Sequence, residues 1–319
     1  MTNGGRFILL SFCLLCGCDG ALNSPGARSG LPSESPAIKI VDRLNRHVLF
    51  RAAPTRIISL SPETTELLFA LDLGSKIVGT TEYCDYPPAA KALPRMGSGP
   101  LGTLSREAII QASPDLVLCK FDAHQPLVQS LERLGIVVLA LGPQSLSEML
   151  EEAAWLGQIT GHTTQAALLT QQMSERLRQL TSRPAMSNDD RRPTVFYQVW
   201  HDPLMTVGPG AFVDELLQMA KLRNIVARSA TAYPRVSLEL LIQEDPDYII
   251  VPRSASVVID FDDIAQRPGW ENLQAIQNRR VLFVDADRVS RCGPRMLDAL
   301  EEIIQAVEEN GSPPALPES

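Results

Sequence analysis

The residues that could perform catalysis or bind a metal are few and scattered along this chain. The sequence contains no glycine-rich phosphate loop and no serine nucleophile elbow. Its four histidines are His47, His124, His162 and His201. Only His124 and His201 follow predicted strand ends, where they could face a common site. The pattern therefore predicts no catalytic triad and no three-histidine metal site.

Side chains suited to binding a large organic molecule do gather at one kind of position. They lie in the loops that follow predicted strands: Tyr83, Tyr86, Leu101, Phe121, Trp200, His201, Tyr233, Asp287 and Arg291. Ligands of open parallel sheets bind beyond the carboxyl ends of the strands. Aromatic and apolar surface with a few charges suits a large, partly flat ligand. A ligand site is therefore expected there.

Short apolar runs alternate with amphipathic segments in two separate stretches, which predicts an α/β fold with parallel sheets. The first stretch has strands at Arg56–Leu60, Lys76–Thr80, Asp115–Cys119 and Val137–Leu141, and helices at Glu63–Leu71, Ser105–Gln111 and Gln125–Leu134. The second has strands at Thr194–Val199, Tyr248–Val251 and Arg280–Val284, and helices at Phe212–Met219, Ser237–Gln243 and Pro294–Glu309.

A long helical segment separates the two stretches. Apolar residues recur at helical spacing after Ser145, which with Glu148 predicts a capping box. A continuous helix of this length would reach roughly 50 Å and suits a strut between two lobes. Gly161 is the position at which it could be interrupted.

An internal repeat supports two similar lobes. The segments Ser105–Asp115 and Ser237–Asp247 both read S-x-E-x-x-I-Q-x-x-P-D and both run into a predicted strand. A weaker similarity links Thr65–Leu68 to Asp214–Leu217. Serine helix caps and Pro-Asp turns are common, but several matches at a constant offset favour duplication.

The N-terminus predicts export. Arg6 precedes an apolar run, Phe7–Leu15, which is too short to span a membrane. The sequence Leu15-Cys16-Gly17-Cys18 resembles the lipobox of bacterial lipoproteins, which implies cleavage before Cys18 and its lipidation. An ordinary signal peptide is the alternative. Three thiols would then remain, Cys84, Cys119 and Cys292, which allow one disulfide; Cys84 with Cys119 is one pairing left open.

The net charge and the positions of the segment boundaries complete the predicted organisation. The net charge of −8 argues against nucleic-acid binding. The predicted parts are a signal peptide at 1–17, a tether at 18–37, an N-terminal lobe at 38–144, an inter-lobe helix at 145–181, a C-terminal lobe at 182–310 and a tail at 311–319. The mature chain is expected outside the cytoplasm, held to a membrane by its lipid.

Three segments carry a family resemblance: RIISLSPETTELLFALDLGSKIVG at 56–79, YCDYPP at 83–88 and PDLV at 114–117. They are similar to the helical-backbone substrate-binding proteins of ABC importers (class III, cluster A), which serve vitamin B12, iron–siderophore complexes and heme. The resemblance implies two Rossmann-like lobes joined by one long helix, a ligand cleft between them and limited closure. It implies a monomeric binding protein without enzymatic activity, whose ligand is cargo rather than cofactor.

Within that class, the members that bind vitamin B12 are the most similar. The resemblance makes Tyr83 a ligand-stacking residue, puts Tyr233 at the position of a cleft tryptophan and assigns Asp287 and Arg291 to the polar rim of a corrin. Leu101 stands where a second tryptophan is expected. Together with Trp200, these are the predicted ligand contacts.

Glu107 and Glu239 form a separate pair, one in each copy of the repeat. The resemblance implies that each meets arginines on one half of a dimeric permease. The alternative is that each carboxylate simply complements a helix dipole.

Other functions stay open at this point. The ligand could be heme, with Tyr83, His124 or His201 as axial ligand, or a ferric siderophore. An enzyme on the same scaffold, a chelatase or reductase, is an alternative of another class, as is a sensor or adhesin that uses the fold without a transporter. No resident metal or cofactor is predicted.

Overall fold

The computed structural model describes residues 37–98, 103–182, 192–254 and 259–310. These residues belong to one compact unit, Ala37–Ser319. The predicted signal peptide, lipidation site, tether and tail, and Leu101, lie outside the described residues. None of the described helices is both long enough and apolar enough to cross a membrane.

The first sheet consists of four parallel strands in the order β4-β3-β5-β6: β3 (Ile57–Ser59), β4 (Ile77–Thr80), β5 (Leu116–Lys120) and β6 (Val137–Leu141). Helices α1 (Pro62–Ala70), α2 (Arg106–Gln111) and α3 (Gln125–Glu132) and the 3-10 helices η1 (Gly74–Lys76) and η2 (Pro88–Ala92) connect them. An antiparallel hairpin, β1 (Ile38–Val41) and β2 (His47–Phe50), precedes the sheet. Strands that are buried on both faces read as continuous apolar runs, as these do.

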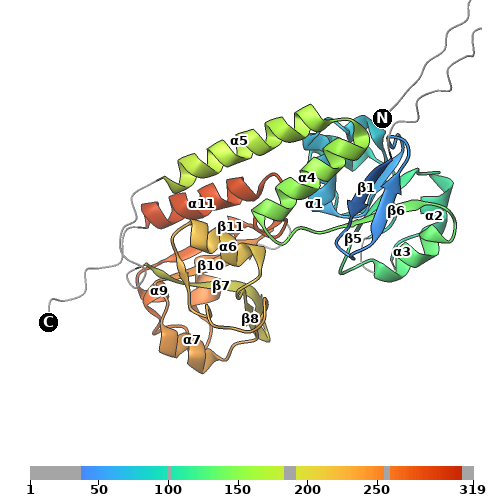
Figure 1. The fold of residues 1–319 in the computed structure, drawn as a ribbon. Coiled ribbons are helices and arrows are strands. Elements are labelled where there is room, and N and C mark those ends of the chain that lie inside the picture. The colour runs from blue at the N-terminus through green and yellow to red at the C-terminus, as the bar shows by residue number, and fades with distance from the viewer. Residues whose placement is uncertain (1–36, 99–102, 183–191, 255–258, 311–319) are drawn as a thin grey trace, which may run out of the picture. The chain divides into compact units, whose positions relative to one another are not determined.

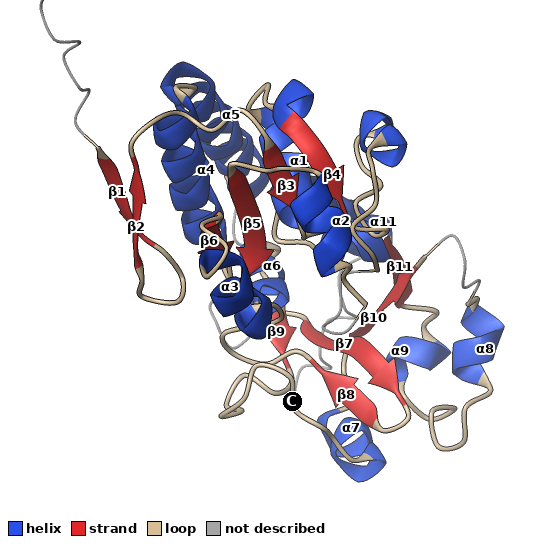
Figure 2. Cartoon of the chain, turned by 90° about the vertical axis from the view of Figure 1, so that its right-hand side faces the viewer, coloured by secondary structure: helices blue, strands red, loops and turns tan. Residues whose placement is uncertain are grey.

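The second sheet has the order β11-β10-β7-β8, and β9 also pairs with β7. Its strands are β7 (Thr194–His201), β8 (Leu204–Thr206), β9 (Arg223–Asn224), β10 (Tyr248–Arg253) and β11 (Val281–Asp285), of which β8 alone is antiparallel to its neighbour. The helices are α6 (Phe212–Met219), α7 (Leu238–Glu244), α8 (Phe261–Ala265), α9 (Gln274–Gln277), α10 (Ala286–Val289) and α11 (Met296–Glu309). The α/β class with parallel sheets is therefore confirmed (Figure 2).

The connection between the sheets is helical, but it is not a single rod. It consists of α4 (Leu146–Thr160) and α5 (Thr163–Thr181), which pack side by side (Figure 1). Gly161 ends α4 with a left-handed backbone (φ 77°), a conformation that glycine adopts without steric cost. A side chain at Gly157 would meet Ala166 Cβ at 2.6 Å, so the two helices approach closely there. The helical connection is therefore interrupted at Gly161, as the glycine allowed, and is not one 50 Å helix; α5 packs against both α4 and α11.

The repeat is confirmed in atomic detail. In each copy a serine caps a short helix, since Ser105 Oγ accepts from Ala108 N and Ser237 Oγ accepts from Leu240 N. In each copy the aspartate also performs the same task. Asp115 accepts from the N–H and hydroxyl of Thr55, just before β3, and Asp247 accepts from the N–H and hydroxyl of Thr194 at the start of β7. Each aspartate thus joins two neighbouring parallel strands at their amino ends.

The cap of α4 is half of the predicted box. Ser145 Oγ accepts from Glu148 N, whereas the Glu148 carboxylate accepts from the N–H of Gln144 instead of Ser145.

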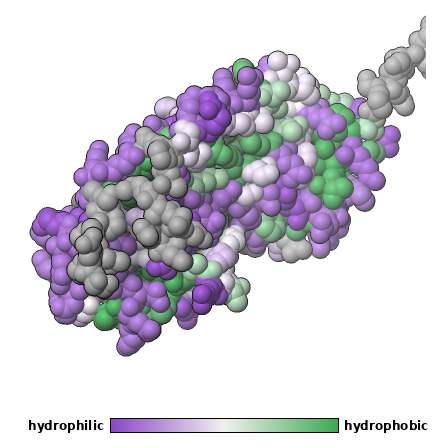
Figure 3. Space-filling model, turned by 60° about the vertical axis from the view of Figure 1, so that its left-hand side comes forward, coloured by the Kyte–Doolittle hydropathy of each residue, from purple (hydrophilic) through white to green (hydrophobic). Residues whose placement is uncertain are grey.

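The hydrophobic core is divided between the two faces of the sheets. One large cluster includes residues from Ile40 to Ile304, and a smaller cluster lies on the other face of each sheet. On the face drawn in Figure 3, polar residues form most of the surface and apolar residues gather in separate patches.

Candidate functional site

A pocket of about 540 Å³ lies at the carboxyl ends of β7 and β10. Trp200, His201 and Tyr233 contribute its aromatic walls, and no aspartate or glutamate belongs to its described lining. The side chains of Trp200 and Tyr233 are 55% and 45% exposed. The remaining lining residues are Tyr197, Gln198, Val199, Val207, Phe212, Val213, Pro252, Arg253, Ser254, Ile259, Ala286 and Ser290. The structure thus brings Trp200, His201 and Tyr233 to one pocket, and their role as ligand contacts stays a prediction.

The pocket walls are held by local hydrogen bonds. Trp200 Nε1 donates to the carbonyl of Asp202 at 2.8 Å, which fixes the indole at the β7–β8 turn. Tyr233 lies in a segment bonded to β8, since Thr206 N donates to Pro234 O and Val236 N donates to Leu204 O. Burial raises the pKa of the Tyr233 hydroxyl, and the charge of Lys120 opposes that rise. Lys120 belongs to β5, so the two sheets come within electrostatic reach of each other here.

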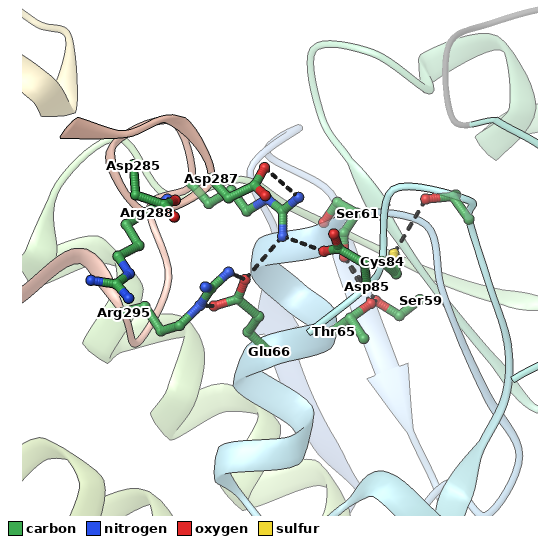
Figure 4. Close-up of polar contacts among 12 residues, drawn as sticks. Ser59, Ser61, Thr65, Glu66, Cys84, Asp85, Asp285, Asp287, Arg288 and Arg295 are labelled. Carbon is green, nitrogen blue, oxygen red and sulfur yellow. Dashed lines mark hydrogen bonds and ion pairs between the residues drawn. The ribbon is translucent and has the colours of Figure 1, made fainter. Parts of the chain in front are cut away.

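Arg291 and Asp287 lie together, with Arg291 Nη2 donating to Asp287 Oδ1 at 2.8 Å. The same guanidinium also bonds Asp85 Oδ1 at 2.8 Å and pairs with Glu66 Oε1 at 3.3 Å (Figure 4). Asp85 and Glu66 belong to the first lobe, so Arg291 joins the lobes. The Arg291 side chain is only 11% exposed, whereas Asp287 and Asp85 are 49% and 40% exposed. The carboxylates, more than the arginine, are therefore accessible to a ligand.

Arg295 completes this cross-lobe network. It forms a two-pronged pair with Glu66, Nε to Oε2 at 2.9 Å and Nη2 to Oε1 at 2.6 Å, and its guanidinium lies 3.9 Å from the centre of the Tyr86 ring. The Glu66 side chain is 2% exposed. Hydrogen bonding to Glu66 raises the pKa of Arg295. Sequence reasoning missed Glu66, whose partners are more than 200 positions away.

A second glutamate crosses between lobes at the equivalent position of the repeat. Glu215, on α6, accepts from the N–H of Leu146 at 3.1 Å, at the first residue of α4. Burial raises the pKa of the Glu215 carboxyl. Glu66 and Glu215 are the glutamates of the matched segments Thr65–Leu68 and Asp214–Leu217. Both copies of the repeat therefore use the same position to reach across the lobe boundary.

Glu152 and Arg43 anchor α4 to the first lobe. Arg43 Nε donates to Glu152 Oε1 at 2.8 Å, and Gly142 N donates to the same oxygen at 3.1 Å. Glu152 is 1% exposed. Burial raises its pKa to about 7, in spite of the hydrogen bond from Arg43.

The histidines do not come together. His124 is buried, and its Nδ1 accepts the N–H of Lys120 at 3.1 Å, so it is not presented to a ligand and the hypothesis that it ligates heme is wrong. His201 lines the pocket and its ring lies 5.7 Å from that of Trp200. His47 lies on β2, and His162 immediately precedes α5, with its Nδ1 3.0 Å from the carbonyl oxygen of Thr160 at the end of α4. No group of three or more potential metal ligands occurs among the residues that the structure describes.

Cys84, Cys119 and Cys292 are buried and unpaired, so Cys84 and Cys119 form no disulfide here. Burial raises the pKa of the Cys119 thiol to about 12. Burial also raises the pKa of Cys292, whose Sγ lies 3.5 Å from the carbonyl oxygen of Ser145. These thiols are packing residues in the described structure.

Tyr83 and the two glutamates of the repeat are accessible. Tyr83 follows β4, at the carboxyl edge of the first sheet, and is 57% exposed. Glu107 and Glu239 are exposed in the first turns of α2 and α7. A hydrogen bond from its own backbone and one from Ser237 lower the pKa of Glu239, which keeps it ionised.

The chain is similar to known proteins both in sequence and in structure. Residues 57–288 match the sequence profile of the periplasmic binding protein family. An uncharacterised ABC transporter substrate-binding lipoprotein of Bacillus subtilis is 28% identical over 94% of this chain and 95% of its own. A vitamin B12-binding protein of Vibrio cholerae is 30% identical over 78% of this chain and 87% of its own. The crystal structure of the periplasmic vitamin B12-binding protein BtuF of Vibrio cholerae superposes with a TM-score of 0.68 at 28% identity, covering 81% of this chain and 98% of that one.

Proposed function

The chain belongs to the periplasmic binding protein family, and we propose that it captures a corrinoid between its lobes and delivers it to an ABC importer. The observation that carries the proposal is the 540 Å³ pocket walled by Trp200 and Tyr233 at the carboxyl ends of β7 and β10. Clefts of this size with mostly apolar walls and few polar groups bind organic ligands. The relative named for vitamin B12 binding supports the choice of ligand.

The chemistry of a corrinoid fits the two kinds of surface present. A corrin ring has a broad apolar face and a rim of carboxamides. Aromatic side chains such as Trp200 and Tyr233 cover apolar faces, and stacking of this kind contributes about 0.5–1.5 kcal/mol beyond area burial. The exposed oxygens of Asp287 and Asp85 can accept hydrogen bonds from rim amides while Arg291 holds both carboxylates in place.

The test is a titration of the purified chain with cyanocobalamin, hemin and ferric siderophores. Binding is followed by tryptophan quenching and by visible absorption of the ligand. We expect cyanocobalamin to bind with a Kd below about 1 μM, a binding free energy near −8 kcal/mol. Trp200→Phe should reduce the quenching, because Trp200 lines the pocket whereas Trp270 is buried. Failure of cyanocobalamin to bind, with tight binding of hemin, would reject the corrinoid.

Heme is the second candidate, favoured by one observation. Tyr83 presents an exposed phenol at the carboxyl edge of the first sheet, where it could serve as an axial ligand to iron. Tyr83→Phe should then change the Soret spectrum of bound hemin. Under the corrinoid proposal, the same substitution keeps the ring that stacks on the ligand and leaves cyanocobalamin affinity nearly unchanged.

For the partner, we propose that Glu107 and Glu239 dock on the two halves of a dimeric permease. Their exposure in the first turns of α2 and α7 and their equivalent places in the repeat support this role, because a two-fold partner requires two similar contacts. Glu107→Lys or Glu239→Lys should abolish uptake in cells and leave ligand affinity intact. Glu82→Lys, an exposed glutamate outside the repeat motif, is the control. Unchanged uptake in both docking variants would reject the role.

For the anchor, we propose lipidation at Cys18, outside the described residues. Cys18→Ser should move the chain from the membrane fraction to the soluble fraction without altering ligand affinity. Retention of the variant in membranes would reject lipidation at this residue.

A further inference from the structure

Lys120 is the last residue of β5, an inner strand of the first sheet, and its backbone is held rigidly. Its N–H donates to Nδ1 of the buried His124 at 3.1 Å, and its carbonyl accepts the N–H of His124 at 3.0 Å. A ring and a backbone amide of one residue thus close the turn that follows the strand. Figure 2 shows β5 pointing toward the second sheet, so this turn fixes a cation at the edge that faces the ligand pocket.

Neighbouring residues also restrict the position of the Lys120 side chain. Its stem passes Gly142, where a Cβ would come within 3.5 Å of Lys120 Cγ and 2.8 Å of the Phe121 ring. Its Nζ lies 3.7 Å from Glu63 Oε1, and 37% of the side chain is exposed. Across the lobe boundary its charge acts on the hydroxyl of Tyr233, a pocket residue. Lys120 therefore pairs with Glu63 in the first lobe and lies within electrostatic reach of Tyr233 in the second.

The ion pair of Lys120 and Glu63 can bond a third group that lies beside it. A separation of 3.7 Å is an ion pair but too long for a hydrogen bond. Glu63 is nonetheless only 8% exposed, and a buried carboxylate ordinarily accepts hydrogen bonds. The ammonium group has three donors and the carboxylate several acceptor positions. A group that inserts beside the pair can thus bond both partners.

We propose that Lys120 and Glu63 together form a carboxamide-binding subsite of the first lobe, which selects ligands with neutral amide rims over ligands with carboxylate rims. This inference rests on the proposed corrinoid function. The ammonium donates to the amide oxygen and Glu63 accepts from the amide nitrogen. A ligand carboxylate would bond Lys120 but would be repelled by Glu63, and the exposed Asp122 beside Lys120 adds to that repulsion. The subsite therefore disfavours the propionates of heme.

The test measures the affinities of cyanocobalamin and of its monocarboxylic acids, in which one rim amide is a carboxylate. Lys120→Met keeps the stem and removes the donor, and should weaken cyanocobalamin binding about ten- to a hundred-fold, as expected for a hydrogen bond from a charged group. Lys76→Met is the matched control, because Lys76 lies just before β4, at the opposite edge of the same sheet. Circular dichroism and thermal melting establish that the variants fold.

Glu63→Gln gives an independent readout that does not depend on loss of binding. We expect at least one monocarboxylic acid to bind the wild-type chain about tenfold more weakly than cyanocobalamin, and Glu63→Gln to remove most of that difference. Unchanged cyanocobalamin affinity in Lys120→Met, or equal affinity of wild-type protein for all the acids, would overturn the subsite alone. Absence of cyanocobalamin binding to wild-type protein would instead overturn the proposed function, and the subsite with it.

Discussion

Neutralising Glu66 should destabilise the protein more than any change to its exposed ion pairs. Glu66 is almost completely buried, yet it carries a charge that Arg295 meets with two hydrogen bonds and Arg291 with an ion pair. Glu66→Gln keeps the size of the side chain and one acceptor oxygen but leaves two partly buried guanidinium groups without their shared carboxylate.

The magnitude follows from burial. Removing one partner of a buried ion pair costs about 3–5 kcal/mol, because the remaining charge stays desolvated. The retained acceptor of Gln and the remaining contacts of Arg291 with Asp85 and Asp287 place the expected loss near the lower end, about 3 kcal/mol. Exposed pairs contribute about 0–1 kcal/mol. Arg176 with Asp298, 40% and 33% exposed, supplies that comparison through Asp298→Asn.

Urea unfolding followed by tryptophan fluorescence measures both losses. Trp155 lies on α4 and Trp270 is buried in the second lobe, so the signal reports on both halves of the structure. We expect the Glu66→Gln midpoint to fall clearly and the Asp298→Asn midpoint to move little. A loss below 1 kcal/mol for Glu66→Gln would refute the reasoning, since Glu66 would then contribute no more than a surface charge.

Two other predictions concern single groups. Because burial raises the native pKa of Glu152 from 4.5 to about 7, the folded chain holds an extra proton between these pH values. The contribution of this one group to stability is therefore complete below pH 4.5 and is lost as pH rises through 7. This group should cost up to about 3 kcal/mol between pH 5 and 8, and Glu152→Gln should flatten the profile measured by urea unfolding; an unchanged slope would contradict the raised pKa. Asp247→Ala should destabilise the second lobe by about 1–3 kcal/mol through loss of its bonds to Thr194, seen as earlier unfolding around Trp270, and Asp115→Ala should not advance that signal.

Local patterns were sufficient to predict most of the framework. Apolar runs bounded by turns located every strand of the first sheet and three strands of the second, because buried parallel strands leave continuous apolar segments. The short strands β8 and β9 carry no such run. The break at Gly161 had a visible signal, a glycine in a helical segment. What decided between interruption and continuation was the packing of Gly157 against Ala166, a tertiary contact that periodicity does not contain.

The candidate site was predictable only in part, for a related reason. Position near the carboxyl end of a strand was enough to single out Trp200, which is one of the last two residues of β7 and lines the pocket. It was not enough to tell an exposed group from a structural one. His124 lies just after β5 and His201 at the end of β7, yet His124 is buried and accepts a hydrogen bond from the backbone of Lys120. Lys120 and Glu63 were passed over because single charges beside strands are usually solvated. Their significance arises from burial and from a partner 57 positions away.

Duplication explains how one sequence unit could come to hold a ligand between its copies. Each copy uses its aspartate, Asp115 or Asp247, to tie strands together at the amino edge of the sheet, which leaves the carboxyl edge free for ligand loops. Each copy uses Glu66 or Glu215 to reach the other half. The two contacts differ in strength, because Glu66 meets two arginines whereas Glu215 meets one backbone N–H.

This difference in strength gives the Glu66 and Glu215 contacts different roles. A single hydrogen bond to a helix end contributes about 0.5–1.5 kcal/mol and can break and re-form at little cost, so the Glu215 contact permits small rearrangements where α4 begins. The Glu66 cluster resists separation because opening it would leave buried charges unpaired. Movement of the lobes should therefore pivot about the Glu66–Arg295 pair, with the lobe boundary opening elsewhere. A cross-link that joins positions 66 and 295 should leave ligand affinity almost unchanged, and a large loss of affinity would contradict this pivot.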